Sequence, residues 1–303
     1  MHTLHQRIAF SFASICAVAC IVSCTDDAQG RADEMRQQQD TLVISKWKLP
    51  KELTFCGERV PLEIPEVRER AEREFYINLQ TPGQIILYIK RSGRYFPTFE
   101  KLLRASGAPD DLKYLSVAES ALFMARSPKD AVGLWQFIPG TGRAYGLMIT
   151  DEVDERRNVV KSTNAAIGYL RAGFASNGSW ANAAAGYNMG HENLQGNLAF
   201  QQKRAYYDLF LNEETSRYLL RIAMIKHLME HAHEYGIIVP ASERYVQEPT
   251  RTIREAGSIS NLTQWAIANR TTYKDVKLLN PWILGRGLPA PPSGKAWEVE
   301  IMR

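Results

Sequence analysis

The feature that most constrains this chain is a glutamate placed inside the apolar stripe of a predicted helix. Pro109 suits the first turn of a helix, and the two aspartates that follow it suit the positive end of the helix dipole. No helix breaker interrupts residues 112–123. Apolar residues recur at i−7, i−4, i+3 and i+4 from Glu119, namely Leu112, Leu115, Leu122 and Phe123. The pattern therefore predicts a helix that turns Glu119 toward the interior.

Two interpretations of Glu119 are open at this point. Removal of a carboxylate from water raises its pKa, so a buried Glu119 can hold a proton near neutral pH and donate it. Alternatively, the side chain bends out to water at a helix end, or it pairs with Arg126 or Lys129 as a structural ion. The motifs that follow Glu119 favour the first interpretation.

Residues 1–24 have the pattern of an export signal. An almost wholly apolar run extends from Ile8 to Val22, which is short for a membrane span and suits a signal-peptide core. The run leads to Ile21-Val22-Ser23-Cys24, which resembles a bacterial lipobox whose cysteine is acylated. An ordinary secretory signal or a short anchor is the alternative. Residues 25–46 are polar and predict a tether. Cys56 is then left alone, so we expect no internal disulfide.

Composition argues against two broad classes of protein. A chain of 303 residues that is 45% hydrophobic can bury one core and a smaller module, and it is too polar for a multi-span membrane protein. The formal net charge of +4 is modest and comes without a block of basic residues. Nucleic acid is therefore not indicated as a partner.

Apolar periodicity predicts a mainly α-helical body over residues 47–240. One helix opens at Pro65 and buries Val67, Ala71 and Phe75. Further helices are expected at 84–90, at 97–106, from 162 or 163 to about 177, and at 216–235. The last of these carries an apolar face that consists of Tyr218, Ile222, Ile225 and Met229. Residues 179–188 are mostly small, which permits close packing of helices.

Residues 241–303 change from long helical patterns to short strand and helix patterns, which predict a small α+β module. A strand near Thr252-Ile253 is followed by helices at 261–268 and 273–279 and by a strand at 296–302. This order resembles a LysM-type module, which implies glycan binding. A small C-terminal cap is the alternative.

Two patterns raise the question of a metal. The loop 150–158 is rich in acids, but it lacks the alternating ligands and central glycine of a calcium-binding EF-hand loop. Residues 227–231 fit the H-x-x-E-H pattern of inverted zinc peptidases, yet they supply only two metal ligands. We therefore expect neither a metal nor another cofactor.

Three short motifs follow Glu119 and Ser120 in order along the chain. They are Gly-Leu-Trp-Gln-Phe at 133–137, Pro-Gly-Thr-Gly at 139–142 and Ala-Gly-Tyr-Asn at 185–188. Together they resemble the signature motifs of the lytic transglycosylases related to goose-type lysozyme, the SLT superfamily, and especially the membrane-bound lytic murein transglycosylase D group. The resemblance covers about 47–229 and is sharp over 112–193. It implies a lysozyme-like helical domain with its catalytic core at about 108–195.

The resemblance implies a role for each matching residue. Glu119 matches the single catalytic acid of the family, and Ser120 matches its neighbouring hydroxyl. Gln136 matches a glutamine in the floor of the glycan cleft, whereas Tyr187 and Asn188 match a pair beside the acid.

Two positions in the motifs leave questions open. Trp135 supplies either a stacking face for a sugar or core packing. Gly186 departs from the family, which usually has alanine there. The departure loosens the backbone before Tyr187 and leaves the reactive groups in place.

The resemblance implies non-hydrolytic cleavage of the β-1,4 bond between N-acetylmuramic acid and N-acetylglucosamine in peptidoglycan, which leaves 1,6-anhydro ends. It also implies a cell-envelope lipoprotein that faces the periplasm from the outer membrane, anchored through Cys24. The alternatives are a hydrolytic lysozyme-type muramidase, with a second acid within 151–155, and a non-catalytic peptidoglycan-binding lipoprotein. The zinc peptidase above is a third.

Overall fold

The computed structural model describes residues 47–303 together with residues 30, 31 and 33. The predicted signal peptide, Cys24 and most of the predicted tether lie outside these residues. The chain divides into two units, Met1–Leu49 and Pro50–Arg303, and the second unit holds the elements described below. Within the described residues, no helix is long and apolar enough to cross a membrane.

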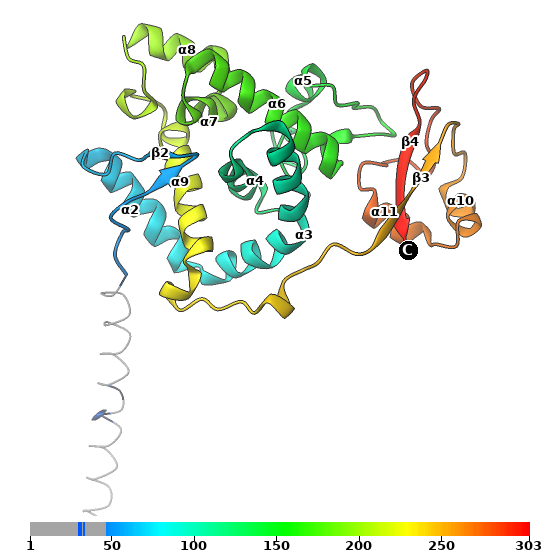
Figure 1. Cartoon of the computed structure of the whole chain (residues 1–303), viewed down its shortest axis with the longest axis horizontal. Coiled ribbons are helices and arrows are strands. Elements are labelled where there is room, and N and C mark those ends of the chain that lie inside the picture. Colours follow the sequence, from blue (N-terminus) through cyan, green and yellow to red (C-terminus); the bar gives the residue numbers. More distant parts are fainter. Residues whose placement is uncertain (1–29, 32, 34–46) are drawn as a thin grey trace, which may run out of the picture. The chain divides into compact units, whose positions relative to one another are not determined.

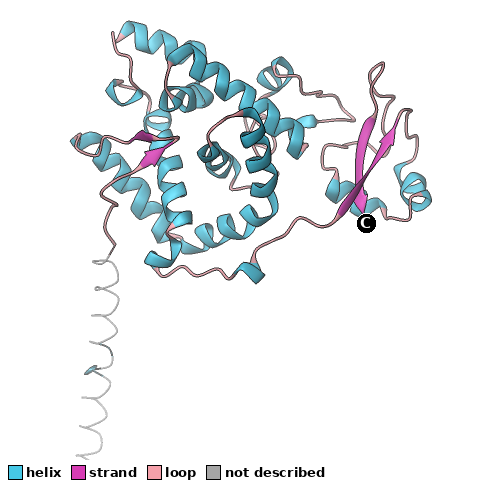
Figure 2. Cartoon of the chain, viewed as in Figure 1, coloured by secondary structure: helices cyan, strands magenta, loops and turns pink. Residues whose placement is uncertain are grey.

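The second unit is mainly α-helical, as the sequence predicts, with two short antiparallel strand pairs (Figures 1 and 2). The first pair joins β1 (Thr54–Phe55) to β2 (Glu58–Arg59) and leads to α2 (Pro65–Gln80). Pro65 stands in the first turn of α2, where its missing N–H costs nothing. The predicted apolar stripe of α2 is buried: Val67, Ala71 and Phe75.

The next helix, α3 (Pro82–Ser106), is continuous, so the prediction of two helices at 84–90 and 97–106 was wrong. Pro97 lies inside α3, where a proline costs about 3 kcal/mol. The buried face of α3 nevertheless continues across it, from Ile89 to Phe99 and Leu103. Burial of each large apolar side chain contributes about 1.5–3 kcal/mol, which outweighs the local cost of the proline.

The helix that carries Glu119 is shorter than predicted. A 3₁₀ turn, η1 (Asp110–Leu112), leads into α4 (Lys113–Ser120). The helix ends there because Ala121 and Leu122 have left-handed φ values of 53° and 56°. Leu122 still reaches the core, but Phe123 is 59% exposed. The prediction of one continuous helix with Phe123 on its inward face is therefore wrong.

The rest of the helical body surrounds α4. It consists of α5 (Pro139–Ala144), η2 (Glu155–Arg157), α6 (Val159–Asn177), α7 (Trp180–Met189), α8 (His191–Phe200), η3 (Tyr206–Asp208), α9 (Glu213–Glu230), η4 (Ala232–Tyr235) and η5 (Ala241–Glu243). Helix α4 packs against α3 and α9, while α7 packs against α6, α8 and α9.

Two of the predicted helix limits are corrected by local hydrogen bonds. α6 begins before the predicted Ser162 because the side chain of Asn158 caps it, accepting from the N–H of Lys161 at 3.0 Å. α9 ends at Glu230 instead of Tyr235, since the chain tightens into the 3₁₀ turn η4.

The C-terminal segment has the predicted order of strand, helix, helix and strand. Its elements are β3 (Thr250–Glu255), α10 (Leu262–Ala268), α11 (Tyr273–Leu279) and β4 (Trp297–Met302). The two strands pair antiparallel, and the inward residues of β4 enter a core cluster shared with α10 and α11. The domain boundary near residue 240 stays a prediction.

Gly93 on α3 allows the segment after α9 to cross this helix closely. A Cβ atom at Gly93 would lie 2.6 Å from the carbonyl oxygen of Tyr245, whose N–H donates to the carbonyl of Lys90 at 2.9 Å. We expect Gly93→Ala to lower the free energy of unfolding by about 1–3 kcal/mol, as overpacking does, in a denaturant titration. Gly83→Ala in the first turn of α3 meets no atom within 4 Å and is the matched control. Equal losses in the two variants would contradict the prediction.

Candidate active site

Glu119 lies one residue before the C-terminal end of α4, and its side chain is half-buried. The hydroxyl of Tyr218, on α9, donates a short hydrogen bond to Oε1 of Glu119. The ion pair considered from the sequence is not formed with Arg126, because Nε of Arg126 binds Oδ1 of Asp130 at 2.8 Å. Glu119 is therefore held by a neutral donor from another helix.

The surroundings of Glu119 raise its pKa to about 7. Burial is the largest cause, because it penalises the charged form, and the negative charge of Glu214 adds to it. The hydrogen bond from Tyr218 and the positive charge of Arg221 act in the opposite direction. A carboxyl with this pKa can both release and accept a proton near neutral pH.

Tyr187 belongs to the same cluster as Glu119. Its pKa is raised well above its usual value by burial and, next, by the charge of Glu119. The hydroxyl of Tyr187 donates to the carbonyl oxygen of Trp135 at 2.7 Å, and its ring packs on Tyr169 and Phe137. The structure thus brings Glu119, Tyr187 and Tyr218 together from α4, α7 and α9.

The side-chain amide of Gln136 holds the loop that follows α4. It donates to the carbonyl oxygens of Gly133 at 2.8 Å and Ala125 at 3.3 Å. The backbone of Gln136 is left-handed, with φ of 50°. A non-glycine residue is uncommon in this region, and such strain often accompanies functional sites.

Trp135 and Ser120 are packed inside the domain. Trp135 has no exposed surface, and its indole N–H donates to Oγ1 of Thr163 at 3.0 Å. The alternative of core packing therefore holds for Trp135, and the stacking role does not. Ser120 is also buried, and its hydroxyl lies 2.9 Å from the carbonyl oxygen of Leu134, which ties the end of α4 to the Trp135 segment.

Asn188 fixes α7 against the start of α9. Its Nδ2 donates to Glu214 at 3.1 Å, and its Oδ1 accepts from Oγ1 of Thr215 at 2.8 Å. Because both ends of its amide bond to the first turn of α9, Asn188 fixes the position of the helix that carries Tyr218.

Sequence reasoning missed the contribution of α9 to this site. Tyr218 was assigned to an apolar face, and Glu214 and Arg221 were not singled out. The available signal was their spacing of i, i+4 and i+7, which places three polar groups on one side of a helix. The spacing alone does not tell which partner that side faces.

The H-x-x-E-H residues make contacts unrelated to Glu119. Tyr114 donates to Glu230 at 3.0 Å, His227 bonds to the hydroxyl of Tyr235 at 2.7 Å, and His231 pairs with Glu234 at 2.9 Å. Within the described ranges, no three His, Cys, Asp or Glu residues form a group that could hold a metal ion.

The ring of His191 explains why residue 186 is a glycine. A Cβ atom on Gly186 would lie 2.1 Å from Nδ1 of His191, and one on Gly173 would lie 2.2 Å from the same ring. The ring of His191 also packs edge-on against Tyr169, and Nε2 lies 3.1 Å from the carbonyl oxygen of Tyr169. The imidazole thus fills the space of an alanine methyl group beside Tyr187.

Comparisons with known proteins match two regions of the chain. Residues 97–210 match the family model of the transglycosylase SLT domain, and residues 251–302 match that of the soluble lytic transglycosylase C-terminal LysM-like domain. Two curated proteins named membrane-bound lytic murein transglycosylase D, from Escherichia coli K12 and from Escherichia coli O6:H1, are each 30% identical over 196 residues. The match covers 62% of this chain and 43% of each relative, so the chain spans less than half the length of these relatives.

Tyr218→Phe removes the donor that stabilises the charged form of Glu119. Because that hydrogen bond lowers the pKa of Glu119, its loss is expected to raise the pKa above the present value of about 7. ¹³C NMR titration of the labelled carboxyl measures this directly. Tyr206→Phe is the matched control, since it removes a buried hydroxyl that bonds to the carbonyl of Thr215 at 2.7 Å. An unchanged or lowered pKa of Glu119 in Tyr218→Phe would contradict the assignment.

Gly186→Ala forces a methyl group into the ring of His191. We expect a loss of about 1–3 kcal/mol in the free energy of unfolding, as in overpacked cores. In a His191→Ala background the same substitution is expected to cost less, because the clashing ring is gone. A double-mutant cycle by chemical denaturation measures the difference, and a cost independent of residue 191 would refute the clash.

Proposed function

We propose that this protein is a lytic transglycosylase that acts on peptidoglycan, because residues 97–210 match the model of the transglycosylase SLT domain and residues 251–302 match that of the LysM-like domain. The observation that carries the proposal is the environment of Glu119, a half-buried carboxyl with a pKa of about 7 that is held by Tyr218. The resemblance stated from the motifs is confirmed by the two family matches.

We propose that Glu119 acts first as an acid and then as a base. It protonates the oxygen that links N-acetylmuramic acid to N-acetylglucosamine, and the bond from C1 to this oxygen breaks. The C6 hydroxyl of the same muramic acid then attacks C1, and Glu119 takes the hydroxyl proton. The products are a 1,6-anhydro end and a free hydroxyl on the leaving sugar, and no water is consumed. Since a pKa near the working pH favours both transfers, one carboxyl suffices.

The acids at 151–155 give little support to the hydrolytic alternative. Glycoside hydrolysis usually employs a second carboxylate to activate water or to attack the sugar. Asp154 is buried and binds the guanidinium of Arg156 through both oxygens at 2.9 Å. Glu155 is buried as well, pairs with Lys161 and accepts from the N–H of Met148 at 2.8 Å. These two carboxylates are engaged in holding their own loop.

Several neighbours of Glu119 support the cleavage indirectly. We assign Tyr187 to substrate orientation beside the acid, because its pKa responds to the charge of Glu119. Gln136 orients the sugar from the loop after α4. Ser120 and Asn188 hold α4 and α7 in place through their hydrogen bonds.

The proposed location is the cell envelope, on the periplasmic face of the outer membrane, with a lipid anchor at Cys24. The relatives named above are described as membrane-bound, and the lipobox resemblance supplies a means of attachment. The LysM-like domain would add affinity for the glycan strands. A non-catalytic glycan-binding protein is less well supported, because it gives no reason for the raised pKa of Glu119.

Glu119→Gln keeps the shape of the side chain and removes the transferable proton. We expect turnover of purified sacculi to fall by about a thousandfold or more, since one group provides both proton transfers. Mass spectrometry of the digest by the parent protein should show anhydro-ended muropeptides. Asp151→Asn, a change at an exposed acid of the 151–155 loop, is the control that should retain activity.

The same digest separates the alternatives. Reducing-end products that disappear in Asp151→Asn would indicate hydrolysis with a second acid. Binding to sacculi without turnover in the parent would indicate a non-catalytic protein, and cleaved stem peptides lost on chelation would indicate a zinc peptidase.

A further inference from the structure

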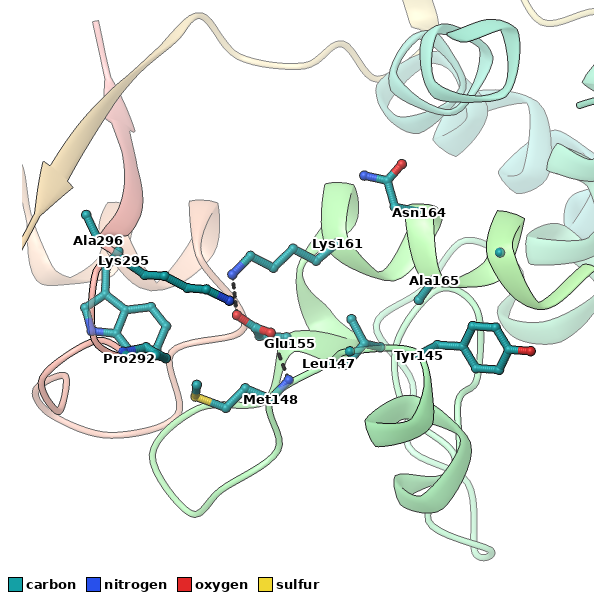
Figure 3. A pocket seen from close by; sticks show the side chains of 13 residues that line it. Tyr145, Leu147, Met148, Glu155, Lys161, Asn164, Ala165, Pro292, Lys295 and Ala296 are labelled. Carbon is teal, nitrogen blue, oxygen red and sulfur yellow. Dashed lines mark hydrogen bonds and ion pairs between the residues drawn. The ribbon is translucent and has the colours of Figure 1, made fainter. Parts of the chain in front are cut away.

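A pocket of about 520 Å³ lies between the α5–α6 region and the C-terminal domain, and it does not include Glu119. The helical side contributes Glu155, Lys161 and Asn164, and the C-terminal side contributes Lys295 and Trp297 (Figure 3). Ligand pockets usually have volumes of about 300–1,000 Å³, so this one has room for a small ligand.

Main-chain hydrogen bonds just outside the pocket lining join the loop before α6 to the C-terminal domain. The N–H of Asp154 donates to the carbonyl of Trp282 at 2.9 Å, and the N–H of Leu284 donates to the carbonyl of Glu152 at 2.8 Å. Val153, between them, is fully buried in the hydrophobic cluster of the C-terminal domain. The pocket is therefore formed before a ligand arrives, which lowers the entropic cost of binding.

The charges that line the pocket are unbalanced. Glu155 is already paired with Lys161 and bonded to the N–H of Met148. Figure 3 shows the side chains of Lys161 and Lys295 reaching toward Glu155 from α6 and from the loop before β4. Within the described part of the chain, Lys295 forms no ion pair within 4.0 Å. One ammonium group in the pocket is thus available to a negatively charged ligand.

Trp297, one of the two aromatic residues that line the pocket, is not a stacking platform for a neutral sugar. Trp297 is only 3% exposed, and Trp282 packs on it with ring centres 5.5 Å apart. The ammonium of Lys161 lies 6.0 Å from the Trp297 ring centre, and the indole N–H donates to the carbonyl of Pro289 at 2.7 Å. The other aromatic residue, Tyr145, is half-buried and packs edge-on against Tyr169. The ionic groups of the pocket are therefore the feature that selects an acidic ligand over a neutral sugar.

We propose that this pocket binds a carboxylate of a short acidic peptide, namely the peptide attached to the glycan strand of peptidoglycan. Lys295 pairs with the carboxylate, the exposed amide of Asn164 bonds to the peptide backbone, and the partly exposed Met148 and Ala296 contact alanine methyl groups. The choice of this peptide rests on the proposed function, whereas the charge and shape of the pocket do not. The site would favour strands that still carry their peptides.

Calorimetric titration of the full chain with the tripeptide L-Ala-γ-D-Glu-L-Lys tests the proposal. We expect saturable binding that weakens about tenfold in Lys295→Gln, the effect of losing one charged hydrogen bond. Lys274→Gln, which changes an exposed lysine of α11 outside the pocket, should leave the affinity unchanged. The same tripeptide with its carboxylates converted to amides should bind at least as weakly as the tripeptide binds to Lys295→Gln.

Three outcomes would overturn the proposal. They are an absence of saturable binding, an affinity that Lys295→Gln leaves unchanged, and binding of peptide-free chitotetraose that depends on Lys295. No bond is cleaved in these titrations, and Glu119→Gln should not alter them. Failure of the pocket proposal is therefore distinguishable from failure of the proposed transglycosylase activity.

Discussion

The hydrogen bond from Tyr218 to Glu119 is the contact on which the site depends. It lowers the pKa of a carboxyl whose burial raises that pKa. Burial alone would raise the pKa of Glu119 further and leave the group permanently protonated, while full exposure would leave it ionised. The hydrogen bond from Tyr218, together with the positive charge of Arg221, opposes burial and keeps the pKa near 7. This balance requires α4 and α9 to meet at a fixed distance, so the packing of the helical body sets the chemistry of its central acid.

Small residues on α6 and α7 let these helices approach closely enough to hold that geometry. Ala183, Ala184 and Ala185 are fully buried, and Gly173 and Gly186 leave room for the ring of His191. The imidazole replaces the methyl group that the family usually places at position 186. Tyr169 contacts both His191 and Tyr187, so the ring of His191 is packed into the same aromatic group as Tyr187. The space that the missing Cβ atom of Gly186 leaves is filled by the ring of His191.

The acid-rich loop at 150–158 connects the helical body to the C-terminal domain. Residues 152–154 pair with the C-terminal domain through their backbone, and Asp154 and Glu155 neutralise Arg156 and Lys161. The composition of this loop raised the possibility of a calcium site or of a second catalytic acid. In the structure, the loop joins the two domains through its backbone. The carboxylates of Asp154 and Glu155 are occupied within the fold. Among the described residues that line the pocket, Lys295 is a cation without an ion pair.

The sequence by itself determined the local elements and singled out Glu119 as the candidate acid. Capping residues, apolar periods of 3.6 and 2, and three ordered motifs act within a few residues, and they gave α2, α11, the C-terminal strand pair and Glu119. Only the tertiary structure decided that α3 runs through Pro97, that α4 stops at Ser120 and that Trp135 is buried. It also decided that Tyr218, 99 residues from Glu119, is the partner of that acid. Local rules describe which face of a helix is apolar, whereas burial and pKa depend on which distant segment covers that face.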